Sequence, residues 1–103
     1  MRQSTIFLLF VAITWSCSQS NGSPMKVDPG EKLFKKYCVA CHGLNGDMQL
    51  NDAKDLRESV LNQEERVLLI SHGRGMMTPF QGLLTPEEIE QVAAYTLQRF
   101  KKE

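Results

Sequence analysis

The sequence predicts a small all-α domain with three main helices and long loops. Three segments open with helix-capping residues, and no stretch alternates apolar and polar residues as a half-buried strand does. The segments that connect the predicted helices, 43–61 and 73–84, are rich in turn-forming residues such as glycine. A chain of 103 residues is long enough for one domain of modest size.

Each predicted helix opens with a capping residue and a glutamate three positions later, which is the pattern of a capping box. These pairs are Asp28–Glu31, Asn62–Glu65 and Thr85–Glu88. We expect the first helix to run to the cysteines at 38 and 41, and the second to end before Gly73. The third should reach Phe100, with Lys101 and Lys102 in its last turn. A short helix is expected around residues 55–60.

The N-terminal segment has the pattern of an export signal. Arg2 supplies a positive charge, and the apolar run that follows, residues 6–13, is too short to cross a bilayer as a stable helix. We therefore expect residues 1–16 to be a signal peptide and the protein to be exported to the periplasm.

Cys17 is the odd cysteine of the three in the chain. Together with the residues before it, Cys17 resembles a bacterial lipoprotein box, so we expect it to be lipidated and to become the mature N-terminus. The alternative is ordinary cleavage near Ser16 or Ser18. Residues 17–27 then form a flexible polar linker, which would tether a domain at 28–103 to a membrane.

The charge balance excludes one class of partner. The chain has 12 basic and 12 acidic side chains, so its formal net charge is zero. We find no basic patch in the sequence, and therefore do not expect nucleic acid to bind.

The segment Cys38-Val39-Ala40-Cys41-His42 has the spacing of a c-type haem attachment site. On a helix, residues i, i+3 and i+4 share one face, so two thiols and an imidazole would face one flat ligand. Two alternatives remain from this motif alone. A thioredoxin-like dithiol expects alternating strands and helices, and a structural zinc site expects four Cys or His ligands.

The second axial ligand of a haem iron has several candidates in this sequence, which are Met25, Met48, Met76, Met77 and His72. Methionine often fills cores, and this interpretation suits Met25 and Met48. Met76 and Met77 instead lie in a glycine-containing loop far along the chain from His42. Such a loop can approach a haem from the opposite face.

From Gly30 to Phe100, the chain resembles a class I monohaem cytochrome c of the mitochondrial and bacterial type. The matching motifs are Gly30 and Phe34 ahead of the cysteines, Ala53-Lys54-Asp55-Leu56 for Ala-Pro-Asp-Leu, residues 73–80 for Gly-Lys-Gly-x-Met-Pro-x-Phe, and Ala94-Tyr95 in the last helix.

The resemblance implies a small cytochrome c fold wrapped around one haem c. Cys38 and Cys41 would hold the haem covalently, and His42 and Met77 would bind its iron. Met76 and His72 remain as alternatives to Met77, although His72 would more naturally cap the end of its own helix.

The resemblance also implies supporting roles for the residues around the haem. The Lys54 carbonyl would accept a hydrogen bond from the His42 ring, and Gly30 would let the last helix cross the first closely. Thr78 departs from the family pattern, which has proline at this position. No tryptophan follows the leader, so Arg74, Arg57 or backbone amides would bind the haem propionates.

The function implied by the resemblance is that of an electron carrier and not an enzyme. It would exchange single electrons with transient redox-protein donors and acceptors in a respiratory or dehydrogenase chain, as a monomer. The alternatives are a haem-based gas sensor or haem enzyme subunit with a labile sixth ligand, and a zinc or dithiol module without haem. Since so small a domain often needs a covalent cross-link or a covalently held cofactor to be stable, we expect the apoprotein to fold poorly.

Overall fold

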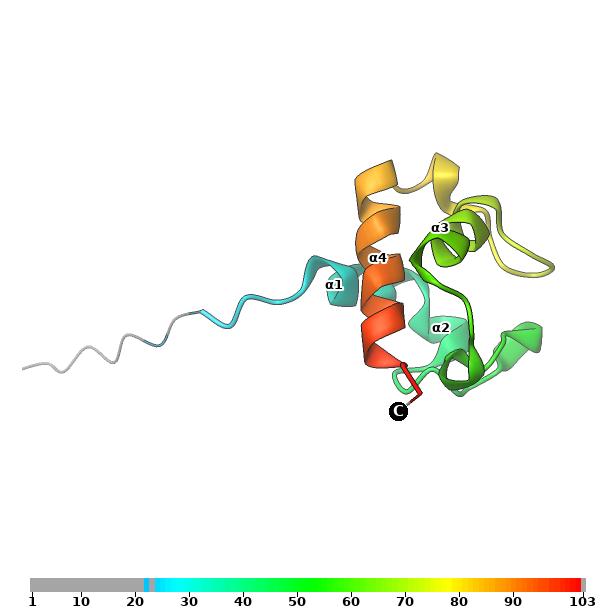
Figure 1. The fold of residues 1–103 in the computed structure, drawn as a ribbon, viewed down its shortest axis with the longest axis horizontal. Coiled ribbons are helices and arrows are strands. Elements are labelled where there is room, and N and C mark those ends of the chain that lie inside the picture. The colour runs from blue at the N-terminus through cyan, green and yellow to red at the C-terminus, as the bar shows by residue number, and fades with distance from the viewer. Residues whose placement is uncertain (1–21, 23, 103) are drawn as a thin grey trace, which may run out of the picture.

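A computed structural model describes residue 22 and residues 24–102 (Figure 1). This part of the chain contains the α-helices α1 (Pro29–Tyr37), α2 (Val39–His42), α3 (Gln63–His72) and α4 (Pro86–Arg99). It also contains three short 3-10 helices, η1 (Leu50–Asp52), η2 (Leu56–Glu58) and η3 (Phe80–Gly82). The predicted all-α class is confirmed, and η2 is the expected short helix. The proposed signal peptide and Cys17 lie outside the described residues.

Two of the three predicted capping boxes start helices as expected. At α3, the Asn62 side chain accepts a hydrogen bond from the Glu65 amide at 2.9 Å, and the Glu65 carboxylate accepts one from the Asn62 amide at 2.8 Å. Thr85 and Glu88 make the same reciprocal pair at the start of α4. These bonds satisfy amides that the first helical turn leaves without partners.

The start of α1 differs from the predicted capping box. Asp28 is the N-cap, and its carboxylate accepts a hydrogen bond from the Gly30 amide at 2.7 Å. Glu31 does not complete the box but forms an ion pair with Lys35 at 2.6 Å, one helical turn later. One capping residue is therefore enough here, because Pro29 has no amide that needs a partner.

The ends of the first and last helices were predicted slightly too long. Cys38 has φ −116° and separates α1 from α2, so the expected continuous helix is broken at the first cysteine. At the other end, α4 stops at Arg99. Lys101 and Lys102 therefore follow the helix and do not lie in its last turn.

The core lies where α1 crosses α4. The ring of Phe34 lies 5.4 Å from the rings of both Tyr95 and Phe100, measured between centroids. α3 and η3 complete this core, whose buried apolar residues are Phe34, Ile70, Phe80, Leu84, Ile89, Val92, Ala93 and Phe100.

Gly30 allows α1 and α4 to approach each other, as the sequence predicts. A Cβ atom at this position would overlap the Gln91 carbonyl oxygen and would lie 2.7 Å from the Cβ of Tyr95. The backbone of α4 cannot move away without opening the aromatic contacts between the two helices. Glycine is therefore required at position 30 for packing.

We expect Gly30→Ala to destabilise the holoprotein by about 1–3 kcal/mol, the usual cost of forcing atoms into a packed core. The measurement is urea unfolding followed by far-UV circular dichroism. Gly82→Ala is the matched control, because a Cβ there would meet no atom within 4 Å. Equal urea midpoints for the two variants would contradict this account of Gly30.

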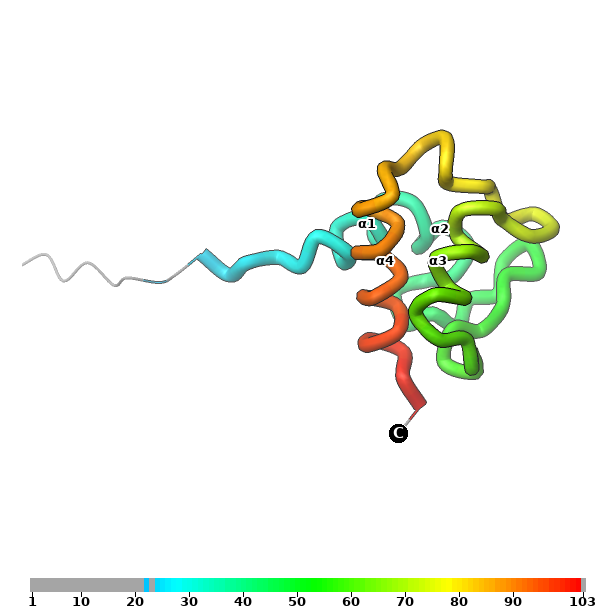
Figure 2. The backbone as a smooth tube through the Cα atoms, turned by 45° about the horizontal axis from the view of Figure 1, so that its top comes forward, coloured from blue at the N-terminus to red at the C-terminus, as the bar shows by residue number. Residues whose placement is uncertain are grey.

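The two long loops lie on the side of the domain opposite to the segment that leads into α1. Figures 1 and 2 show residues 24–28 approaching from one end, while the loop with η1 and the loop after α3 lie side by side at the other end. None of the helices in the described part of the chain is long and apolar enough to cross a membrane.

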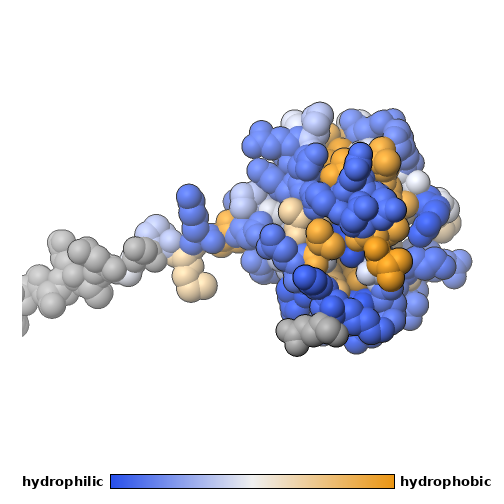
Figure 3. All heavy atoms as spheres, viewed as in Figure 1, coloured by the Kyte–Doolittle hydropathy of each residue, from blue (hydrophilic) through white to orange (hydrophobic). Residues whose placement is uncertain are grey.

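The small core leaves many apolar side chains uncovered. Figure 3 shows apolar residues gathered near the middle of one face, with hydrophilic residues around them. The large apolar residues exposed among those described are Met25, Val27, Leu44, Met48, Leu50, Val60, Leu68, Met76 and Leu83. Protein packing alone therefore shelters only part of the apolar surface of this domain.

Candidate haem site

A cavity of about 950 Å³ lies between the helices and the two loops. Its wall is largely apolar and includes residues of α1, α2, α3, α4 and both loops. The volume is at the upper end of the range of roughly 300–1,000 Å³ that is usual for small-molecule and cofactor sites. Cys38, Cys41, His42 and Met77, the four predicted haem-binding residues, all line this one cavity.

The short helix α2 brings the first three of these residues together. The amides of Cys41 and His42 donate hydrogen bonds to the Cys38 carbonyl at 3.3 and 2.9 Å. The segment therefore makes one helical turn despite the break at Cys38. Both thiols are free of disulfide bonds, as covalent attachment of a haem requires.

The imidazole of His42 is fixed by the backbone. Its Nδ1 lies 3.1 Å from the Lys54 carbonyl oxygen, which confirms the predicted bond although lysine replaces the usual proline. Because only a protonated nitrogen can donate to a carbonyl, Nε2 is left with a lone pair for a metal. Burial lowers the pKa of His42 more than this hydrogen bond raises it, which favours the neutral ring.

The Cys38 thiol does not have the properties of a reactive thiol of a dithiol pair. Burial, together with the neighbouring Cys41, raises the pKa of Cys38 to about 12. Reactive thiols of C-x-x-C motifs have lowered pKa values, since the thiolate is the nucleophile. In the described ranges, no group of three or more His, Cys, Asp or Glu side chains is placed to hold a metal ion. The thioredoxin and zinc interpretations therefore gain no support.

Met77 reaches the cavity from the loop that follows α3. It is half-buried against the core, and its amide donates to the Arg74 carbonyl at 3.0 Å. Gly73, with φ +67°, permits this close turn, because a Cβ there would clash with the Met77 carbonyl oxygen. The tight turn thus fixes the backbone of Met77 at the cavity wall.

The other candidate ligands differ from Met77 in position. Met76 also lines the cavity but is 73% exposed. His72 is exposed and does not line the cavity, and the expected cap of α3 is formed by the Gly73 amide, which donates to Leu69. Met25 and Met48 are exposed as well, so their interpretation as core residues was wrong.

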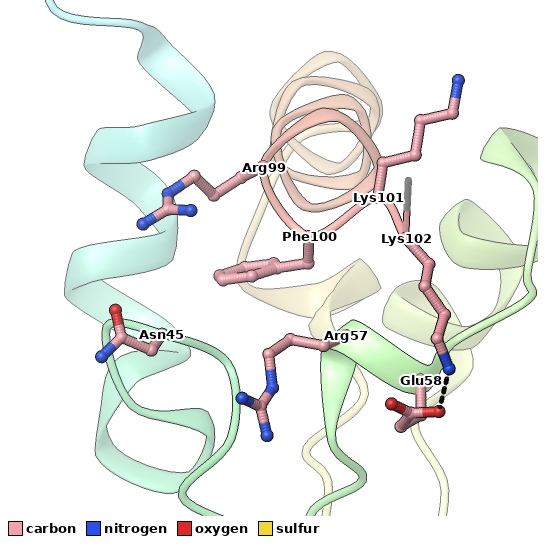
Figure 4. Close-up of a pocket in the computed structure, with 7 residues that line it drawn as sticks. All are labelled: Asn45, Arg57, Glu58, Arg99, Phe100, Lys101 and Lys102. Atoms are coloured by element: carbon pink, nitrogen blue, oxygen red, sulfur yellow. Dashed lines mark hydrogen bonds and ion pairs between the residues drawn. The ribbon is translucent and has the colours of Figure 1, made fainter.

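Arg57, one of the predicted propionate partners, lies elsewhere. Its guanidinium forms an ion pair with Asp55 at 2.7 Å and approaches Asp47 at 3.4 Å. Figure 4 shows it in a separate pocket beside Phe100 and the pair formed by Glu58 and Lys102. The assignment of Arg57 was wrong because its charge is already used by neighbouring carboxylates. Arg74 does line the large cavity, at an exposed position.

Arg66 is a charged cavity residue that was not predicted from the sequence. It is 4% exposed and lies on the wall together with Thr96 of α4, to which it donates a hydrogen bond. The spacing of residues along α3 indicates that Arg66 is buried. Arg66 lies four residues before Ile70 and therefore on the same buried face of α3.

Comparisons with known proteins identify relatives of this chain. A family model described as cytochrome c oxidase, cbb3-type, subunit III matches residues 26–95. Cytochrome c6 of Leptolyngbya boryana is 35% identical over 79 residues, which cover 71% of this chain and 92% of the relative. Cytochrome c6 of Gloeothece citriformis is 38% identical, covering 71% of each chain.

A solved structure shares the fold. Cytochrome c6C from Synechococcus sp. PCC 7002 superposes with a TM-score of 0.62 at 31% identity, over 69% of this chain and 93% of that one. Both the arrangement of the helices and the sequence thus match proteins named cytochrome c. The chain belongs to the cytochrome c family and is a monohaem c-type electron carrier, not an enzyme.

Proposed function

We propose that Cys38 and Cys41 would hold the haem through thioethers and that His42 and Met77 would bind its iron. The observation that carries this proposal is the bond between His42 Nδ1 and the Lys54 carbonyl, in a cavity that Met77 also lines. Such outer bonds fix the tautomer and the orientation of a metal-binding imidazole. The cavity fits the group, since its wall combines apolar side chains with two thiols, an imidazole and a thioether.

Bound there, the haem supplies a one-electron ferric/ferrous couple, and a His/Met ligand pair raises its potential. The residues of the chain keep this couple free of side reactions. With both His42 and Met77 bound to the iron, no position would be left for a substrate. Phe34, Ile70 and Val92 keep water from the buried wall. Leu50, Val60 and Met76 line the cavity but are exposed, so they form an apolar rim. A redox partner would dock on this rim weakly, over a small area.

The test is expression with a cytochrome c maturation system, followed by intact mass and absorption spectra. We expect the mass of one haem to be added, and the weak far-red band of sulfur bound to ferric iron. A colourless product without added mass would contradict the haem site. An oxidised spectrum without the far-red band, together with ready carbon monoxide binding, would instead favour a gas sensor or haem enzyme.

We further propose that the chain is exported and anchored through a lipid on Cys17, as a periplasmic carrier in a respiratory or dehydrogenase chain. Residues 18–28 span at most about 36–40 Å when fully extended, which gives the domain a limited reach from a membrane. The intact mass also tests this proposal. Protein purified from membranes should begin at Cys17 and carry lipid, whereas Cys17→Ser should appear in the soluble fraction without it. Unlipidated wild type would contradict the anchor.

A further inference from the structure

Arg66 is a buried charge to which the electron-transfer site proposed above assigns no role. Its side chain is 4% exposed, and it lines the same cavity as His42 and Met77. An isolated charge is costly to bury unless an opposite charge or several hydrogen bonds compensate it. The partners of its guanidinium therefore indicate what the cavity is built to hold.

The two hydrogen bonds of this guanidinium are to neutral oxygens. Nε donates to the Leu61 carbonyl at 2.9 Å, and Nη1 donates to Thr96 Oγ1 at 3.2 Å. The Thr96 hydroxyl in turn donates to the Ala93 carbonyl at 2.8 Å, so its orientation is fixed as well. A guanidinium has five N–H groups. Within residues 24–102, the remaining three make no hydrogen bond.

The carboxylates on the cavity wall do not neutralise Arg66. Asp55 is paired with Arg57 at 2.7 Å, and Glu58 is paired with Lys102 at 2.8 Å. Asp52 is exposed and is not paired with Arg66. Among the described residues, Arg66 therefore has no ion-pair partner, although it is oriented by two bonds at the wall of a cavity.

We propose that Arg66 binds a propionate carboxylate of the haem, and that Leu61 and Thr96 hold its guanidinium in position to do so. The inference rests on the proposed function, because it requires the haem to occupy this cavity. A carboxylate would supply the missing negative charge and would accept N–H groups of Arg66. Arginine suits this role, since its planar guanidinium matches the two oxygens of a carboxylate.

A fixed positive charge beside a propionate has a measurable effect on the couple. It offsets the carboxylate charge, which would otherwise favour ferric iron, and it keeps the carboxylate ionised as the pH falls. Apart from Cys38, Cys41, His42 and Arg66 itself, the charged or titratable side chains on the wall are Tyr37, Asp52, Lys54, Asp55, Glu58 and Arg74. None is a histidine, the type whose charge ordinarily changes between pH 5 and 8.

The experiment is a redox titration of the holoprotein between pH 5.5 and 8 for wild type and Arg66→Gln. The wild-type potential should be nearly constant over this range. In Arg66→Gln, the buried carboxylate loses its partner, so burial raises its pKa into the range and its ionisation lowers the potential as the pH rises. At pH 8, we expect the ratio of reduced to oxidised Arg66→Gln, at a fixed applied potential, to be about tenfold lower than that of wild type, or about 59 mV for one electron.

Two further variants separate this role from packing and from total charge. Arg66→Lys keeps the charge. Its ratio of reduced to oxidised protein at the same applied potential should stay within about twofold of that of wild type, even if its stability falls. Lys32→Gln removes one positive charge from an exposed place on α1 outside the cavity and should leave the potential nearly unchanged.

The outcomes are distinct. A wild type without haem would overturn the proposed function itself. Haem-containing Arg66→Gln with the potential and pH dependence of wild type would overturn only the role of Arg66, as would a Lys32→Gln effect of equal size. If Arg66→Gln does not incorporate haem, the redox titrations of wild type and Arg66→Lys test the inference. A wild-type potential that falls steadily from pH 5.5 to 8 overturns the inference. So does a ratio of reduced to oxidised Arg66→Lys that is about tenfold lower than that of wild type at the same applied potential.

Discussion

The double variant Cys38→Ala/Cys41→Ala, expressed without any other change, is expected to remain largely unfolded in water. Without thioethers, the large cavity has no covalently held occupant, and its apolar wall faces solvent. The packed core is small and lies mainly between α1 and α4. Domains of this size are only marginally stable without a covalent cross-link or a bound cofactor. The loss of stability therefore approaches the whole free energy of unfolding, at least about 5 kcal/mol.

The measurement is far-UV circular dichroism during a urea titration. Wild-type holoprotein should unfold in one cooperative transition, whereas the double variant should show a weak helical signal and no cooperative transition. Cys17→Ser is the control, because it removes the cysteine outside the predicted domain and should unfold like wild type. A double variant with native helix content and a sharp transition would show that the polypeptide folds without the haem.

Replacing Met77 is expected to change the iron more than any other substitution outside the attachment motif. Met77→Ala should lose the far-red sulfur–iron band, bind carbon monoxide readily in the ferrous state, and have a lower potential. The drop should be on the order of 100 mV or more, since axial ligands move haem potentials over roughly 0.8 V. Optical redox titration and carbon monoxide difference spectra measure these changes.

Met76→Ala is the matched control, because it removes the same side chain one residue earlier in the same loop. Its spectra and potential should remain close to those of wild type, since Met76 is 73% exposed. If Met76→Ala loses the far-red band while Met77→Ala keeps it, the ligand assignment is reversed. If His72→Ala alone loses the native spectrum, the methionine assignment is wrong altogether.

The sequence predicts this fold well where a local rule determines the structure. Asn62 and Thr85 start helices because their side chains, with the glutamates three residues later, satisfy backbone amides at once. The position of Gly30 was also predictable, since the family resemblance requires a close crossing at this point. The attachment motif behaves similarly, because its spacing alone places three side chains on one helical turn.

Tertiary contacts explain what the sequence did not predict. Arg57 and Arg66 both lie near the proposed haem site. Arg57 forms an ion pair with Asp55, two residues away, whereas Arg66 is buried against α4. The spacing of Arg66 and Ile70 indicates one face of α3, but only the packing of α3 against α4 shows that this face lines the cavity. The left-handed backbone at Gln49, Asn51 and Asp52 was likewise unpredicted, since L-residues other than glycine seldom adopt it.

The direction from which the chain enters α1 affects how a membrane-held form would work. Residues 24–28 arrive at the end of the domain opposite the two loops, and Leu50 and Met76 on those loops mark the open rim. A lipid on Cys17 would therefore hold the domain by the end that lies away from the rim. The rim would then be free to face the aqueous space, where soluble partners could reach it while the protein stayed confined to the bilayer surface.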